Sequence, residues 1–271
     1  MTSDANIINM EYSELSYKKA INDLFNRHPS IQNAGFTAGA YKPGLNGMLS
    51  FSSATGDPWK QYKCIHVAGT NGKGSVSSMI AAGLASTGLR VGLYTSPHLV
   101  DFRERMKIIS GDTWEMPSEE EVMDFLQKHS LDGLSFFEIT TGMAFKWFAD
   151  RKVDFAVIET GLGGRLDSTN IITPEVSVVT SIGLDHCALL GNTRAEIAFE
   201  KAGIFKPGVP AVVGARDPQT QPVFEKKAAE TGSPLIFAED FEGPLFDTDL
   251  TGPHQRENLR TALCALDTIG I

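Results

Sequence analysis

The sequence predicts an α/β protein whose sheet is doubly wound and mostly parallel, with helices on both faces. Three observations support this prediction. Short apolar runs rich in β-branched residues alternate with helical patterns across about 180 residues. A glycine-rich turn joins the first of these runs to a helix. Polar residues follow four successive runs, at the strand ends where open parallel sheets bind ligands.

The glycine-rich turn lies between the apolar run Ile65–Ala68 and a helical pattern over residues 75–87. A strand, a glycine loop and a helix in this order aim backbone N–H groups and a helix dipole at one point, where a phosphate can bind. The strict pattern G-x-x-x-x-G-K-[ST] is not met, because Val67 replaces its first glycine and Gly74 separates Lys73 from Ser75. The alternative is an ordinary glycine-rich turn with a solvated lysine.

The composition is that of a globular protein with a full core, with 42% apolar and 21% charged residues among 271. The net charge of −9 argues against general affinity for nucleic acid or anionic membranes, so an anionic substrate would need a locally positive pocket. The three cysteines show no C-x-x-C spacing and are expected to be free thiols of a reducing compartment. With a polar N-terminus and no membrane-length apolar run, we expect a cytoplasmic protein.

The first part of the chain carries two helical patterns before the glycine turn and a strand after its helix. The spacing predicts a helix at 12–27, a loop with special backbone angles at 35–47, a short helix at 48–54 and a strand at 90–94. Ser96 directly follows that strand, so it is either a magnesium ligand or a turn-capping residue. The mixed charges at 101–105 are typical of a solvated surface loop, and 106–109 of a short strand.

The middle of the chain predicts two helices and a buried strand. A capping box formed by Ser118 and Glu121 opens a helix at 119–129, and an apolar helix spans 136–150. Glu138 lies among apolar neighbours of that helix and needs a partner or water. The strand at 153–158 ends in Glu159, a carboxylate placed like a magnesium ligand of the Walker B arrangement.

The last part continues the alternation. A strand at 176–181 is followed by His186, for which a role in the site is favoured, and a capping box at Thr193 opens a helix that carries Lys201. Taken alone, Lys201 has the pattern of a solvated helix surface. The remaining predictions are a strand at 209–214, a helix at 219–231, a strand at 235–238, an edge hairpin or loop at 240–251, and a helix at 254–269.

Together these segments resemble the folylpolyglutamate synthase/dihydrofolate synthase branch of the Mur ligase family. The matching stretches are VAGTNGKGS (67–75), LYTSPHL (93–99), FRER (102–105), FFE (136–138), ETGLGGRLDSTN (159–170), LDH (184–186) with LG (190–191), EKAGIFKP (200–207), and HQ (254–255) with Asn258. The GTNGK core is shared with other Mur ligases, whereas K-G-S, S-P-H-L and G-G-R-L-D-x-T-N are more specific to the folate branch. The resemblance implies the P-loop-containing central domain of a Mur ligase.

The resemblance also implies an activity. Such an enzyme is an ATP-dependent ligase that adds L-glutamate to the carboxylate of a folate, of dihydropteroate, or of both. ATP phosphorylates the carboxylate, and the amino group of glutamate attacks the acyl phosphate with loss of phosphate. Both steps bring anions together, so positioning and cationic charge supply most of the catalysis. The implied partners are small molecules alone, and a monomer is expected.

Residue roles follow from the matched motifs. The ATP-binding set would be Gly69, Thr70, Asn71, Gly72, Lys73, Gly74, Ser75 and, at the adenine, Asn258. The magnesium ligands, for two expected ions, would be Ser96, Glu159 and His186. Lys201 matches a lysine that the family carbamylates, so its ammonium would become a carboxylate, and it would be catalytic together with Lys73 and His186. The pterin-bearing substrate would contact Tyr41, Lys42, Pro43, Ser135, Phe136, Phe137, Glu138, Leu166, Asp167 and Ser168.

The chain is expected to be one ATP-binding unit over 1–271, with a helical and loop part at about 1–60 covering the substrate site. Its last helix, about 252–271, would lead to an absent C-terminal domain, since family members continue for about 130–150 residues that carry most of the glutamate site. Cys187 stands where the family often has threonine. Two alternatives to a ligase of folates stay open: an ATP- and pteroate-binding fragment without turnover, and a Mur-type ligase acting on a peptidoglycan precursor.

Overall fold

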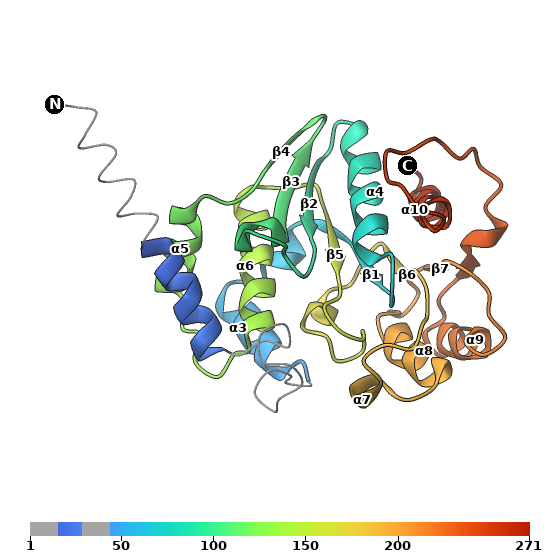
Figure 1. The fold of residues 1–271 in the computed structure, drawn as a ribbon, viewed down its shortest axis with the longest axis horizontal. Coiled ribbons are helices and arrows are strands. Elements are labelled where there is room, and N and C mark those ends of the chain that lie inside the picture. The colour runs from blue at the N-terminus through green and yellow to red at the C-terminus, as the bar shows by residue number, and fades with distance from the viewer. Residues whose placement is uncertain (1–15, 29–43) are drawn as a thin grey trace.

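A computed structural model describes residues 16–28 and 44–271. In this part of the chain, one eight-stranded sheet has the order β4-β3-β2-β5-β1-β6-β7-β8 (Figure 1). The strands are β1 Lys63–Ala68, β2 Arg90–Tyr94, β3 Met106–Ser110, β4 Thr113–Glu115, β5 Phe155–Glu159, β6 Val176–Val179, β7 Ala211–Val213 and β8 Leu235–Phe237.

Strand direction confirms the doubly wound prediction. The six strands from β2 to β8 in the sheet order pair in parallel, while β3 and β4 form an antiparallel edge. From β1 the chain passes to β2 on one side, and from β6 it continues to β7 and β8 on the other. The winding therefore reverses at β1, and the crevice beyond the carboxyl end of such a strand is where this architecture binds ligands.

Alternate residues of the central strands face opposite layers of helices. Ile65 and Val67 pack with α4 (Lys73–Ser86) and α10 (Gln255–Thr268), which lie together on one face of the sheet in Figure 1. Cys64 packs with α3 (Asn46–Ala54), α5 (Glu119–Lys128) and α6 (Phe136–Asp150) on the other. Ala68 joins a third cluster with α8 (Arg194–Ala202) and α9 (Gln221–Thr231). This period of two is what a strand buried on both faces requires.

Most predicted elements are present with small changes of their ends. Residues 16–27 are helical, and α4 begins at Lys73 rather than at Ser75. The predicted capping boxes open α5 and α8, and a third opens α6, where Ser135 and Glu138 bond each other's backbone N–H. Between the turn η4 (Ala238–Asp240) and α10 the chain is a loop without strands, so the edge-hairpin alternative at 240–251 is wrong. Tyr41, Lys42 and Pro43 lie outside the described residues.

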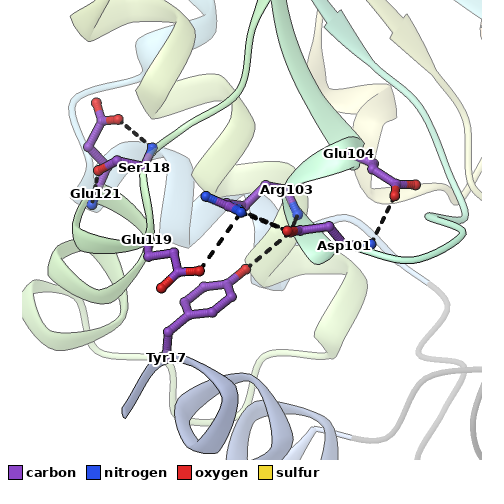
Figure 2. Close-up of polar contacts among 7 residues, drawn as sticks. All are labelled: Tyr17, Asp101, Arg103, Glu104, Ser118, Glu119 and Glu121. Carbon is purple, nitrogen blue, oxygen red and sulfur yellow. Dashed lines mark hydrogen bonds and ion pairs between the residues drawn. The ribbon is translucent and has the colours of Figure 1, made fainter. Parts of the chain in front are cut away.

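The charged segment 101–105 is not the solvated loop that its composition indicated. It forms a 3-10 turn, η2 (Phe102–Arg105), in which Asp101 and Glu104 make a capping box. Figure 2 shows Arg103 placed between Asp101 and Glu119, with the Tyr17 hydroxyl directed at Asp101. Arg105 is only 3% exposed, because its guanidinium stacks on the Phe136 ring and its Nε donates to His98 Nδ1. Composition alone does not reveal which charges of such a segment are buried.

Every helix within residues 16–28 and 44–271 is too short or too polar to span a lipid bilayer.

Candidate active site

The glycine loop after β1 is held against the end of β6. Only glycine fits at position 69, because a Cβ built there would lie 1.8 Å from Thr180 Oγ1. The Thr180 hydroxyl donates to the Asn71 carbonyl at 2.7 Å, and the Thr70 N–H donates to the Ser181 carbonyl at 2.7 Å. These contacts fix the turn and leave the N-terminus of α4 at the carboxyl edge of the sheet. The hydroxyl residues after β6 were not singled out in the sequence, where only their position after a strand marks them.

Gly72 brings the last helix to the same loop. Its φ of 82° is left-handed, a conformation that glycine adopts without strain. A Cβ at this position would lie 2.4 Å from Asn258 Oδ1, so α10 packs directly over the turn. Gln255 links this helix to the loop, because its Nε2 donates to Ser75 Oγ at 3.4 Å and its Oε1 accepts from Asn258 Nδ2 at 2.9 Å. Asn258 therefore lies beside the glycine loop, as its predicted role in ATP binding requires.

Three predicted residues meet at the tips of β1, β5 and β2. Lys73 Nζ lies 4.0 Å from Glu159 Oε1, and the Ser96 backbone N–H donates to Glu159 Oε2 at 3.3 Å. Glu159 is 3% exposed, and its Oε2 lies beside Gly74 of the loop, where a Cβ would be 3.7 Å away. Burial raises the pKa of Glu159 to about 7, an effect that the ammonium of Lys73 opposes.

Lys201 reaches the other side of the loop from α8. Its Nζ donates to the Gly69 carbonyl at 2.8 Å, and the residue is 4% exposed. Burial, reinforced by the nearby charge of Lys73, lowers the pKa of Lys201 to about 7. Near neutral pH a large share of this amine is therefore uncharged. The solvated helix surface that the sequence pattern indicated for Lys201 is wrong, because the side chain is buried against the glycine loop.

The segment after β5 encloses Lys201 because two motifs pack together. The Arg165 N–H donates to the Glu200 carbonyl at 2.7 Å. A Cβ on Gly164 would lie 2.7 Å from that same carbonyl, so only glycine permits this approach. Asn170 Nδ2 donates to the carbonyls of Arg165 and Gly203, both at 3.0 Å, and Lys206 Nζ donates to the Asn170 carbonyl at 2.7 Å. The stretches 159–170 and 200–207 thus form one wall.

A small polar pocket lies between this wall and the glycine loop. Its lining includes three predicted catalytic residues, Lys73, Lys201 and His186, with backbone of the glycine segment after β5. His186 has a left-handed φ of 51° at the start of α7 (Cys187–Leu190), and its Nε2 lies 3.5 Å from Asp185 Oδ2. Lys73 thus belongs to two sets of residues. It lies near Glu159, which the Ser96 N–H contacts, and it also lines the pocket with His186 and Lys201.

The predicted substrate residues are spread over different environments. Ser135 and Glu138 bond each other at the start of α6, and Phe136 is buried in the core. Phe137 is partly exposed and lies over Gly161, where a Cβ would approach its ring to 2.4 Å. Asp167 and Ser168 are buried at the turn η3 (Ser168–Ile171), whereas Leu166 is half-exposed. Of the described residues of this set, Ser135, Phe137 and Leu166 are partly exposed.

A divalent ion fits this edge only together with ligand oxygens. No group of three or more His, Cys, Asp or Glu side chains within 16–28 and 44–271 is arranged to hold a metal by itself. Magnesium is commonly bound through one or two carboxylates with phosphate oxygens and water as its other ligands. The buried carboxylate of Glu159, close to a lysine and a phosphate-type loop, has the donor chemistry for that mode.

Comparison with known proteins gives the same assignment. Residues 67–242 match the Mur ligase middle domain. A dihydrofolate synthase/folylpolyglutamate synthase of Bacillus subtilis is 38% identical over 260 residues, which cover 83% of this chain and 59% of that protein. The folylpolyglutamate synthase structure of Thermotoga maritima matches with 34% identity and a TM-score of 0.79, covering 95% of this chain and 63% of that one.

A folylpolyglutamate synthase solved with AMPPCP and folate matches with 33% identity and a TM-score of 0.77, covering 93% of this chain and 67% of that one. The chain spans 59% or less of the length of the first curated relatives it matches. These similarities and the fold agree with the motifs. The chain belongs to the Mur ligase family, in the branch of the folylpolyglutamate and dihydrofolate synthases.

Proposed function

We propose that this chain is the ATP-binding part of a ligase that joins L-glutamate to the carboxylate of a folate or of dihydropteroate. The observation that carries the proposal is the convergence of Lys73, Glu159 and Lys201 on one strand edge beside a glycine loop. The names of the relatives and the AMPPCP and folate held by one of them supply the chemical identity of the ligands.

ATP would place its phosphates over residues 69–75. Backbone N–H groups at the start of α4 would donate to phosphate oxygens, and Lys73 would neutralise charge that builds up during transfer. Asn258, packed on Gly72, would contact the nucleotide base. A magnesium ion would bind to Glu159 and the Ser96 hydroxyl, with a second near His186, and it would supply charge stabilisation for the transferred phosphoryl group.

Lys201 has the properties that carbamylation requires. A neutral amine attacks CO₂, forming an N–C bond and releasing one proton, and its lowered pKa makes the neutral form abundant near pH 7. The resulting carboxylate would reverse the sign of the charge next to Lys73 and His186. It would then orient a cation instead of repelling one.

The reaction balances in two displacements. A carboxylate oxygen of the acid attacks the γ-phosphorus of ATP and ADP leaves, which gives an acyl phosphate. The amino group of glutamate then attacks the acyl carbon, the C–O bond to phosphate breaks, and the amine loses a proton. This chain's residues would bind and orient the phosphates and exclude water around Lys73 and Lys201. Phe137 and Leu166 are the side chains best placed to contact the acid.

The same proposal includes a cytoplasmic monomer. Cys64, Cys187 and Cys264 are all free thiols, which suits a reducing compartment. Because the chain spans 59% or less of the length of the first curated relatives it matches, a unit that binds ATP and pteroate without turnover is the second candidate.

The decisive test measures phosphate release by the 271-residue chain with ATP, magnesium, glutamate and either tetrahydrofolate or dihydropteroate. Turnover that needs both glutamate and the pteroate compound supports the ligase. Tight nucleotide binding without turnover supports the binding unit. Turnover only with a peptidoglycan precursor as the acid would contradict the folate assignment.

A further inference from the structure

A buried histidine lies in the middle of β1, behind the glycine loop. His66 is fully buried, and its Nε2 lies 2.8 Å from Thr169 Oγ1 in η3. Burial lowers the pKa of His66 to about 3, and the charge of Lys206 acts in the same direction. The imidazole is therefore neutral and carries a single N–H.

The surroundings determine which nitrogen holds that proton. His66 Nδ1 is buried and has no hydrogen-bond partner among the described residues. A proton there would be an unsatisfied buried donor, while Nε2 has a hydroxyl within reach. Thr169 has one hydroxyl proton, and it donates that proton to Asp167 Oδ1. Burial raises the pKa of Asp167, but hydrogen bonds from the Leu162 N–H and from the Thr169 N–H and hydroxyl oppose this shift and favour the carboxylate. The bonds therefore run in one direction, from His66 Nε2–H to Thr169 and from the Thr169 hydroxyl to Asp167.

The far oxygen of Asp167 reaches the pocket wall. Asp167 Oδ2 accepts the Leu162 N–H at 2.8 Å, while Oδ1 also accepts the Thr169 N–H at 3.0 Å. Leu162 lines the pocket with Gly161 and Gly163. Ordering a glycine-rich backbone costs conformational entropy. A carboxylate that accepts hydrogen bonds from its N–H groups restricts the conformations that the segment can adopt.

We propose that His66 and Thr169 are positioning residues, which hold Asp167 so that its carboxylate fixes the backbone of Gly161–Gly163 in the pocket. Neither side chain reaches the pocket itself, and both act through the chain of hydrogen bonds. The effect on catalysis rests on the proposed function, whereas the chain of bonds does not. In this proposal Asp167 acts by fixing the backbone conformation of residues 161–163, and its side chain does not need to contact the substrate.

The first experiment is ¹⁵N NMR of labelled histidine in the 271-residue chain without ligand. We expect His66 to be neutral with its proton on Nε2 throughout pH 5–8. A proton on Nδ1, or an imidazolium in this range, would overturn the proposal. This measurement needs no substitution, so it decides the question even if variants at this site do not fold.

The second experiment compares Thr169→Val, which keeps the shape and removes the hydroxyl, with Thr169→Ser, which keeps the hydroxyl. Hydrogen exchange of the Leu162 amide is measured in each variant, with circular dichroism as the check of folding. Loss of a buried hydrogen bond to a charged group predicts exchange faster by about tenfold or more in Thr169→Val. Thr169→Ser should stay close to the parent. Equal exchange in the valine variant and the parent would overturn the proposal, as would a serine variant as fast as the valine one.

The two proposals fail separately. An inactive parent with the Nε2–H tautomer and a protected Leu162 amide would contradict the ligase and leave the positioning role intact. An active parent with the other tautomer would contradict the positioning role alone. In an active parent, Thr169→Val should reduce turnover and serine should restore it.

Discussion

Two charged clusters of this molecule differ in burial. The difference distinguishes a cluster that stabilises the fold from one that forms the candidate active site. The cluster in Figure 2 joins Tyr17, Asp101, Arg103 and Glu119, and its side chains satisfy one another. At the strand edge, Lys73 and Glu159 are 4.0 Å apart and more deeply buried. No carboxylate within residues 16–28 and 44–271 forms an ion pair with Lys201, whose Nζ donates to a backbone carbonyl. The first cluster holds elements together. The second holds charged groups whose charged forms burial disfavours, which is typical of functional sites.

Replacing Lys73 by alanine should give the largest change. Loss of one well-placed donor typically costs about 10²–10³ in rate, and in the proposed function the lysine would also carry the charge that faces the phosphates. Calorimetric titration with AMPPCP and magnesium, together with phosphate release, measures both effects. Lys60→Ala is the control, because Lys60 is an exposed lysine paired with Asp57. Unchanged ATP affinity and rate in Lys73→Ala would mean that the loop is not a phosphate site.

Lys201→Ala should lose activity, and short carboxylic acids in the buffer should partly restore it. The reason is that a small acid can occupy the place of the carbamate, which the alanine variant cannot form. Activity is measured across a series of formate and acetate concentrations. Lys226→Ala, on the exposed surface of α9, should behave as the parent with and without acid. Full activity of Lys201→Ala without added acid would remove the carbamate role.

Glu159→Gln should bind magnesium–ATP poorly and yet resist unfolding better than the parent above pH 7. The folded protein raises the pKa of Glu159 from 4.5 to about 7, so between these values it holds more protons than the unfolded chain. The Glu159 contribution to the parent's free energy of unfolding should therefore fall as pH rises through this window, by an amount on the order of 3 kcal/mol. Buried His66 and Lys201 change stability in the opposite direction in this range, but they do so equally in the parent and in the glutamine variant. Urea unfolding of both proteins at pH 5 and pH 8 therefore measures how far the parent falls relative to the variant. Equal pH dependence in both proteins would contradict this prediction.

Arg103→Lys should have the smallest effect. Lysine cannot reproduce the paired contacts of the guanidinium with Asp101, but the pair is partly solvated, so the loss should be below about 1 kcal/mol. Urea unfolding at low and high salt measures it, and salt should reduce the difference between variant and parent. Arg27→Lys, at an exposed position of the same N-terminal helix as Tyr17, is the control. A loss of several kcal/mol would show that this cluster is not a surface network.

Much of the fold could be predicted because its signals are local. Apolar runs of strand length, capping residues and the glycine turn gave α6 at 136–150 and β2 at 90–94 with their observed ends. The observed helix α4 begins at Lys73, two residues before the predicted start at residue 75, because the helical pattern of apolar residues is recognisable only from there. The resemblance to a family, rather than periodicity, singled out Lys201 and Asn258, and the structure does place both beside the glycine loop.

The sequence by itself determined the order of strands and helices, the glycine turn and the polar residues at strand ends, because each depends on neighbours within a few residues. Only the tertiary structure decided which charges are buried. Arg105 under Phe136, Lys201 on the Gly69 carbonyl and His66 behind Thr169 are set by segments up to 132 residues apart. Burial removes water from a charged or polar group, and it is this long-range exclusion of water that shifts a pKa and directs a hydrogen bond.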